Sequence, residues 1–318
     1  MPADSSASAS PRFTVIVPTY RRVELLTQAL ASVAAQTFTD YEVIVVDDDP
    51  GASAADTVTT FAKLHPDIVV EYFLNDHASG GAGTRNAGLA RASGAWIAFL
   101  DDDDTWFPDK LERVNDLISA SNDPDLALVY TGNVKYDFDE QKATQANPPR
   151  YRGNLLQRVL YENVIGGMSV AVVRRSLLLE IGGHDERFES LQDMELYVRV
   201  AERGTFDFVE QPLVRIRVSP RVRITFNPRK KLQGARLFEE KYAHLMAGSP
   251  RLKHRAASRT FVFAFAASDY LQLAKSVPWT LAGLVVDPTN ISYVFRSLIR
   301  QMKSRRVRTV STVRAPAR

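Results

Sequence analysis

Short apolar runs alternate with amphipathic stretches over the first 130 residues, and this alternation constrains the fold more than any other feature of the chain. Each apolar run has the length of a strand, and each amphipathic stretch repeats its apolar positions with helical spacing. The run Tyr41–Val46 is apolar at nearly every position, as expected of a strand covered on both faces. Strands and helices that alternate in this way predict an α/β fold with a Rossmann-like, mostly parallel sheet and helices on both faces.

In this first part the expected strands cover 13–17, 41–46, 68–74, 95–100 and 126–130, and the expected helices cover 22–35, 54–64, 81–92 and 109–120. A polar connection over 137–153 precedes a helix over 154–161, a strand over 168–173, a helix over 193–203 and two strands over 206–209 and 213–218. Beyond Pro220 only helices are expected, over 229–245, 251–275 and 291–303. The chain therefore divides into a sheet domain over 12–220, a C-terminal helical region over 221–303, and disordered ends over 1–11 and 304–318.

Composition excludes several classes of protein. The chain has no cysteine, which rules out disulfides, thiolate metal sites and cysteine nucleophiles. The net charge of +3 is too small to indicate a nucleic-acid partner, but eight basic residues and no acid lie over 288–318, leaving −5 for residues 1–287. No apolar run reaches the roughly 18 residues of a membrane span, and residues 1–11 lack the apolar core of a secretory signal. We therefore expect a cytoplasmic protein, with peripheral contact to the cytoplasmic membrane face as an open alternative.

Acidic residues follow the expected strands directly. Asp47–Asp49 follow the second strand, and Asp101–Asp104 follow the fourth. In an open parallel sheet, ligands bind outside the carboxyl ends of the strands. Four consecutive carboxylates are costly unless a cation lies among them, and Asp101 and Asp103 alternate so that both can face one point. An acidic turn that only caps the next helix is the plain alternative, but the convergence of the strand ends favours a divalent-metal site.

The segment Gly80–Gly88 opens a helix with several glycines. Glycines allow close approach of the backbone to a phosphate, whose charge a helix N-terminus favours, and Arg85 can add a charge-assisted contact. The segment lacks the Lys-Ser/Thr ending of a P-loop and the third glycine of a dinucleotide fingerprint. It indicates a phosphate-bearing ligand without identifying it.

Five motifs in order resemble those of family 2 glycosyltransferases, the inverting enzymes of the GT-A fold, from roughly Phe13 to Val218. They are FTVIVPTYRR at 13–22, the paired Asp ending 41–48, Asn75 with the stretch 82–88, WIAFLDDDDTW at 96–106, and the acceptor-side IGGHDERF at 181–188 with LQDMELYVR at 191–199. The chain departs from the family pattern where Asp49-Pro50 replaces Gly-Ser, where His184 replaces Phe and where Gln192 replaces an acid. The last two departures lie on the acceptor side.

The resemblance implies transfer of a sugar from a nucleotide-diphosphate sugar to a hydroxyl of a saccharide or a lipid-linked acceptor. It implies that Asp101 and Asp103 hold Mg²⁺ or Mn²⁺ against the diphosphate. It assigns donor binding to Pro18, Thr19, Tyr20, Arg22, Asp48, Asn75, Gly83, Arg85, Asp101 and Asp102. A carboxylate at Asp48 would accept from the N3–H of uracil or thymine, which inclines the expectation to a UDP- or dTDP-sugar.

The resemblance also implies that Asp193 is the general base, taking the acceptor proton while the hydroxyl attacks the anomeric carbon with inversion. The plain alternative is an acid that complements the helix dipole. The expected acceptor side consists of Trp106, Gly167, His184, Asp185, Glu186 and Gln192. Within this set Trp106 is expected to line the sugar pocket, and His184 is expected in a solvated loop.

Two other functions stay open. The first is a catalytically silent GT-A module that binds a nucleotide sugar or a partner. The second is a sugar-phosphate nucleotidyltransferase, because GGAGTR at 80–85 is similar to that family's signature, although here it follows the third strand and not the first. The C-terminal region has two readings as well: its aromatic helix and basic tail contact an anionic membrane, or its helices pack on the catalytic domain.

Overall fold

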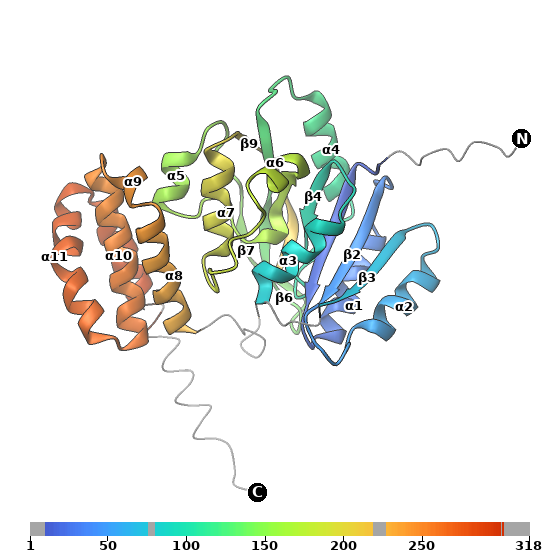
Figure 1. Cartoon of the computed structure of the whole chain (residues 1–318), viewed down its shortest axis with the longest axis horizontal. Coiled ribbons are helices and arrows are strands. Elements are labelled where there is room, and N and C mark those ends of the chain that lie inside the picture. The colour runs from blue at the N-terminus through green and yellow to red at the C-terminus, as the bar shows by residue number, and fades with distance from the viewer. Residues whose placement is uncertain (1–9, 76–79, 219–226, 300, 302–318) are drawn as a thin grey trace, which may run out of the picture. The chain divides into compact units, whose positions relative to one another are not determined.

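The computed structural model describes residues 10–75, 80–218, 227–299 and 301, so the expected basic tail and nearly all of the expected N-terminal lead lie outside the described residues. The chain forms two compact units. The first comprises residues 1–187 and 192–223, and the second comprises 188–191 and 224–318 (Figure 1). The boundary predicted near residue 220 lies close to this division.

The first half of the sheet is parallel, as the alternation predicts. Its strands lie in the order β3 (Val69–Leu74), β2 (Tyr41–Asp47), β1 (Phe13–Thr19) and β4 (Trp96–Phe99). The helices of this half are α1 (Val23–Ala34), α2 (Ala55–Leu64), α3 (Gly80–Arg91) and α4 (Lys110–Ala120). β1 and β2 are almost wholly buried, since helices cover the sheet. Because β1 lies between β2 and β4, the ends of these three strands are neighbours.

The second half of the sheet is mixed, so the expectation of a mostly parallel sheet holds for the first half only. β8 (Ala171–Arg174) runs antiparallel between β4 and β6 (Leu126–Asp137), and β6 pairs in parallel with β9 (Thr205–Arg217). The short β5 (Thr105–Trp106) completes this edge, antiparallel to β9. A 3-10 turn, η1 (Met168–Val170), occupies the start of the expected strand 168–173, and β8 follows it directly.

Two local elements differ from expectation. The polar connection 137–153 contains β7 (Lys142–Asn147), a hairpin partner of β6 whose residues are nearly all exposed, so no apolar alternation marks it. The two strands expected over 206–218 are one strand, β9, whose register shifts beside Pro212. The remaining helices of this unit are α5 (Leu156–Tyr161), α6 (Arg175–Glu180) and α7 (Gln192–Ala201).

The second unit is helical. It contains α8 (Pro228–Lys241), α9 (Ala243–Met246), α10 (Pro250–Ala267), α11 (Tyr270–Val286) and a further helical segment over 289–299. The single helix expected over 251–275 is interrupted at Ser268, whose φ of 57° is left-handed, and Asp269 then caps the new helix by accepting from the Gln272 amide. Within the described part of the chain, no helix has both the length and the apolar character needed to cross a membrane.

Candidate functional site

The carboxyl ends of β1, β2 and β4 bring the sequence-predicted acids to one edge of the sheet. Thr19 ends β1, Asp48 follows β2, and Asp101 begins the turn after β4. α3 starts beside the β2 end, because the Gly80 amide donates to Asp48 Oδ2 at 3.0 Å. The site therefore rests on buried parallel strands, which fix its geometry.

Three carboxylates converge after β4. Asp101, Asp103 and Asp104 each offer one oxygen, and these oxygens lie within 4.8 Å of one another. Burial and mutual repulsion raise the pKa of Asp103 and raise that of Asp104 further. Asp104, which the sequence analysis did not single out, accepts from Ser169 Oγ at 2.6 Å and from the Arg217 amide at 3.1 Å. An all-oxygen, anionic donor set of this kind fits a hard divalent cation.

Two arginines pair with the acids of this turn. Arg22 Nη1 lies 2.9 Å from Asp102 and 3.1 Å from Asp103, and Arg85 Nη2 donates to Asp101. Asp102 turns away from the three-carboxylate cluster and accepts from Thr19 Oγ1 at 2.8 Å. Burial raises the pKa of Asp102 to about 6, against the opposing effect of Arg22. Asp102 therefore ties the turn to β1, whereas the other three acids face one point.

The Asp48 carboxylate is held from two directions. Asn75 Nδ2 donates to Oδ1 at 2.7 Å, and the Gly80 amide donates to Oδ2. Asn75 belongs to the nucleotide-side set expected from the sequence, and Gly80 belongs to the glycine-rich start of α3. The neighbouring Asp47 has a different function, because it accepts from the Asp49 and Ala54 amides and from the Tyr72 hydroxyl and so shapes the loop after β2.

Asp193 lies in the first turn of α7, partly exposed. Its Oδ2 accepts from Asn163 Nδ2 at 2.9 Å, and its Oδ1 accepts from the Met194 amide at 2.8 Å. Desolvation raises its pKa, and nearby Asp101 adds to this, while Arg85 lowers it. The carboxylate therefore lies within electrostatic range of the cluster after β4.

Arg85 joins the two halves of the site. One nitrogen, Nη2, pairs with Asp101, and the other, Nη1, donates to the Gln192 side-chain oxygen at 3.2 Å. Gln192 immediately precedes Asp193. The buried Arg85 guanidinium therefore connects the carboxylate cluster after β4 to the start of α7.

The loop 181–187 is fastened to α3 through Asn86. Asn86 accepts from the His184 amide at 2.7 Å, and its Nδ2 donates to the His184 carbonyl and to Glu186, both at 2.9 Å. Asp185 accepts two hydrogen bonds from the Arg187 guanidinium and one from the Arg187 amide. The loop thus presents Glu186 beside α3 and keeps Asp185 engaged with its own neighbour.

The expectation of a solvated His184 is wrong. Its ring is buried and lies edge-on to Phe99, with centroids 5.5 Å apart. Neither ring nitrogen has a hydrogen-bond partner among the described residues. Burial, with smaller effects from Arg85 and Arg199, lowers its pKa well below the usual value, so the ring is neutral. The histidine fills the apolar position that the family pattern gives to phenylalanine.

The other sequence-predicted residues are placed as follows. Trp106 is 1% exposed and donates from Nε1 to the Ser169 carbonyl at 3.0 Å, which puts its indole in the core and not on an open surface. The Gly167 carbonyl accepts from the Tyr197 hydroxyl at 3.3 Å. Tyr20 is exposed after β1, Pro18 lies within β1, and Gly83 is buried in the first turn of α3.

Besides Asp104, three residues near the site escaped the sequence analysis: Asn163, Ser169 and Arg217. Asn163 bonds Asp193, and it also shapes its own loop by accepting from the Ile165 and Gly166 amides. Ser169 bonds Asp104 through Oγ and accepts there from the Asp101 amide. Only Asn163 carried a signal, because an asparagine shortly before Gly166-Gly167 is typical of a turn.

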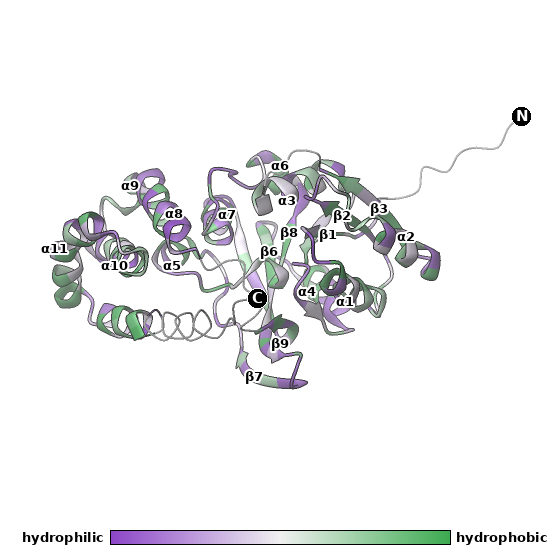
Figure 2. Cartoon of the chain, turned by 90° about the horizontal axis from the view of Figure 1, so that it is seen from below, coloured by the Kyte–Doolittle hydropathy of each residue, from purple (hydrophilic) through white to green (hydrophobic). Residues whose placement is uncertain are grey.

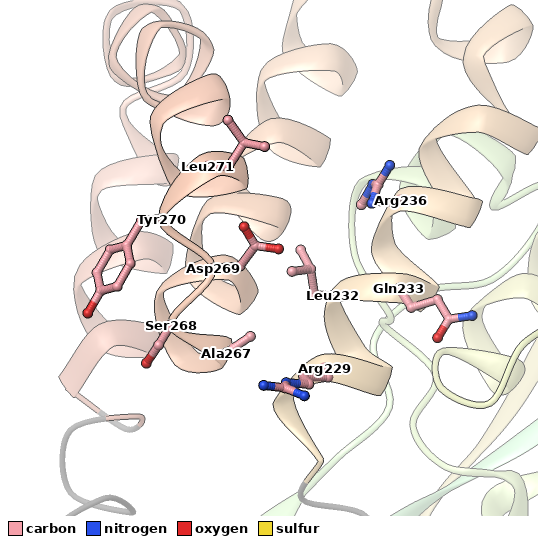
Figure 3. Close-up of a pocket in the computed structure, with 9 residues that line it drawn as sticks. All are labelled: Arg229, Leu232, Gln233, Arg236, Ala267, Ser268, Asp269, Tyr270 and Leu271. Atoms are coloured by element: carbon pink, nitrogen blue, oxygen red, sulfur yellow. The ribbon is translucent and has the colours of Figure 1, made fainter.

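A separate cavity of about 800 Å³ lies in the helical unit, between α8 and the turn from α10 to α11 (Figure 3). Arg229 and Arg236 line its α8 side, and Asp269, Tyr270 and Leu271 line the other. None of the sequence-predicted site residues contributes to it.

The chain matches the family model described as "Glycosyl transferase family 2" over residues 14–182. A glycosyltransferase of Haemophilus influenzae whose function is uncharacterised is 30% identical over 61% of this chain and 63% of its own length. The Escherichia coli protein WfgD, named as a UDP-Glc:alpha-D-GlcNAc-diphosphoundecaprenol beta-1,3-glucosyltransferase, is 35% identical over 34% of this chain and 42% of its own length. The chain therefore spans less than two thirds of these relatives.

Among solved structures, Staphylococcus aureus TarS 1–349 in complex with UDP-GlcNAc superposes with a TM-score of 0.65. Its sequence is 17% identical, and the match covers 94% of this chain and 92% of that one. At this identity the likeness concerns the fold, which is that of GT-A glycosyltransferases, as expected from the sequence.

Proposed function

This chain belongs to glycosyl transferase family 2, and we propose that it moves a sugar from a nucleotide-diphosphate sugar to an acceptor hydroxyl. The observation that carries the proposal is the convergence of Asp101, Asp103 and Asp104 at one point, with Arg85 connecting Asp101 to the helix that bears Asp193. Such an arrangement suits a reaction in which a diphosphate departs on one side and a proton is removed on the other.

Asp101, Asp103 and Asp104 would hold Mg²⁺ or Mn²⁺. A bound divalent cation supplies positive charge to the departing diphosphate in place of a general acid. Arg22 and Arg85 already lie against the acid turn, so they keep it folded while the carboxylates are charged. Asp104 differs from the other two because it is fully buried and bonded to Ser169, which makes it an anchor for the cluster.

The nucleotide would bind beside Thr19, Asp48 and Asn75. Asn75 and the Gly80 amide orient the Asp48 carboxylate, which could then accept from the N3–H of a uracil or thymine base. The complex of TarS with UDP-GlcNAc supports a uridine donor for a protein of this fold. We therefore favour a UDP-sugar over a dTDP-sugar.

Asp193 would act as the general base. Its Oδ2 is oriented by Asn163, and its raised pKa favours uptake of a proton. The base removes the proton of the acceptor hydroxyl, the hydroxyl oxygen bonds to the anomeric carbon, and the bond from that carbon to the diphosphate oxygen breaks. Attack from the face opposite the leaving group inverts the configuration in one displacement.

The acceptor would lie against the loop 181–187 and the glycine turn before η1. Glu186 and Gln192 offer polar atoms there, and Asp185 is held by Arg187. WfgD is named for a diphosphoundecaprenol acceptor, which supports a lipid-linked saccharide as the class of acceptor here. Peripheral contact with an anionic membrane through the basic C-terminal region would suit such an acceptor.

A thermal-shift screen of UDP, dTDP, GDP and CMP, each with and without Mn²⁺, tests this function. A ligand at a hundred times its dissociation constant adds roughly 2.7 kcal/mol to the free energy of unfolding. We expect Mn²⁺-dependent stabilisation by UDP, followed by sugar transfer from the matching UDP-sugar. Binding without turnover would indicate a silent module, and pyrophosphate release from a nucleoside triphosphate would indicate a nucleotidyltransferase.

A further inference from the structure

Helix α11 packs with its small and polar residues inward. Ser276, Thr280 and Gly283 are buried, and a Cβ on Gly283 would lie 2.7 Å from the His254 Cβ of α10. These buried positions are three or four residues apart, and the same spacing continues beyond the helix to Asp287 and Asn290, which are both buried. The seam between the helices is therefore narrow and polar, which leaves the large apolar residues of α11 on the other side.

The outward residues of α11 form one part of an apolar face. Leu271, Trp279, Leu281, Val285 and Val286 are 49–84% exposed. Figure 2 shows hydrophobic colouring along this helix. These are residues that a helix of a soluble unit normally buries, so their exposure needs an explanation.

The helical segment over 289–299 carries a second exposed apolar stripe. Ile291, Phe295 and Ile299 recur every fourth residue on one side and are 52%, 66% and 38% exposed. Its inward Asn290 accepts from Arg255 at 3.3 Å, so again the polar residue is the buried one. Of fourteen large hydrophobic side chains exposed in the described part of the chain, nine lie over 270–299.

Positive charge lies within and beside this face, since Lys275 is four residues from both Leu271 and Trp279 on the same side of α11. Lys275 and Arg296 are exposed, whereas Asp287, the one acid in the sequence 270–299, is buried and pairs with Arg251 at 2.8 Å. The cavity of the helical unit shares Leu271 with the face, and Arg229 and Arg236 also line it (Figure 3). The sequence 288–318 contains eight basic residues, Arg296 among them, and no acid.

We infer that the apolar face of α11 and residues 289–299 docks flat on an anionic lipid surface. An apolar stripe with aromatic residues and flanking Lys and Arg is the pattern of an interfacial helix, and anionic headgroups complement the charge. A second copy of the chain is the weaker occupant, because a symmetric contact would bring the same basic residues together. The inference assigns a specific surface to the membrane contact named under the proposed function, and it does not depend on the transferase activity.

Flotation of the full chain with vesicles tests the inference. We expect flotation with phosphatidylcholine vesicles that contain phosphatidylglycerol, weaker flotation with phosphatidylcholine alone, and a decrease with salt. The double variant Trp279→Glu and Phe295→Glu should bind roughly tenfold or more weakly, because two apolar anchors are replaced by charges that anionic lipid repels. Leu64→Glu is the matched control, since Leu64 is 69% exposed in the other unit, and it should float like the unaltered chain.

Equal flotation of the double variant and the control, or no flotation of the unaltered chain, would overturn the inference. Light scattering without lipid gives a second readout: a dimer that the double variant dissociates would assign the face to a second copy and also overturn it. If the double variant does not fold, as judged by circular dichroism, Lys275→Glu with Arg296→Glu replaces it and should weaken flotation through charge alone. Nucleotide-induced thermal shifts measured on the same samples separate this outcome from failure of the proposed function.

Discussion

Asn163 donates from its side-chain amide to Asp193 Oδ2, across thirty positions of sequence, at 2.9 Å. The same nitrogen also donates to the Gly166 carbonyl, and the Asn163 oxygen accepts from two amides of its own loop. The proposed base is therefore oriented by a residue whose own position is fixed by a turn. This relationship yields the first prediction.

Replacing Asn163 by alanine should lower kcat about tenfold and shift the acidic limb of the pH–rate profile to higher pH. A hydrogen bond to a carboxylate stabilises its charged form, so its loss raises the pKa of Asp193 and delays deprotonation as pH rises. Steady-state kinetics across pH measures both effects. An unchanged profile with an intact fold would assign Asn163 to loop structure alone.

Asp193→Asn should reduce transfer by roughly 10²–10⁴-fold, the range expected for loss of a general base. Nucleotide-dependent thermal stabilisation should persist, because Asp193 is not assigned to the nucleotide. Asp109→Asn is a suitable control, since Asp109 pairs with Arg113 on the exposed side of α4. Full transfer activity in the Asp193 variant would refute the assignment.

Asp103→Asn should remove the Mn²⁺-dependent part of the nucleotide thermal shift. Without metal, the variant should melt at or above the temperature of the unaltered chain, because burial and Asp101 disfavour the charge at Asp103 and raise its pKa. Differential scanning fluorimetry with Mn²⁺ and with EDTA checks both results. A metal effect that survives the substitution would place the cation elsewhere.

Lys110→Met should stabilise the fold. The ammonium is fully buried, 4.8 Å from the centre of the Trp106 ring, and burial lowers the pKa of Lys110 to about 7. The folded chain therefore loses stability as pH falls from about 10 toward 7, by at most ~1.4 kcal/mol per pH unit, and no further below that. Urea unfolding at pH 7 and pH 10 should show the advantage of Lys110→Met at the lower pH only, with exposed Lys63→Met as the neutral control.

His184→Phe should remove an acid sensitivity of the fold. The folded-state pKa of His184 lies well below that of the unfolded chain, so protonation favours unfolding as pH falls below about 6.5. Phenylalanine would keep the edge contact with Phe99 without a proton to gain. Unfolding curves at pH 7 and pH 5 should converge for the variant more than for the unaltered chain; parallel losses in both would contradict this.

The first half of the sheet could be predicted because each of its strands is buried and followed by an amphipathic helix. The position of the aspartates at the strand ends could be predicted for the same reason. The sequence could not indicate the antiparallel insertion of β8, because a short apolar run reads alike in either direction. Nor could it indicate that Asp104 joins the cluster and Asp102 leaves it, since that choice depends on Ser169, Arg217 and Arg22, which come from distant segments. The break between α10 and α11 could not be predicted either, because its left-handed residue is Ser268 and not the glycine that usually marks such a helix end.

The placement of β8 has a consequence for the order in which this molecule can assemble. Ser169 lies just ahead of β8 and, sixty-five positions after Asp104, holds that carboxylate; its hydroxyl also accepts from the Asp101 amide. Contacts so remote in sequence form late, because closing a long loop is entropically costly. A nascent chain that has released only the residues up to the end of β5 would carry every aspartate of the cluster yet lack Ser169, which bonds Asp104 and Asp101. The ability to bind a divalent cation should therefore arise only when the second half of the sheet forms.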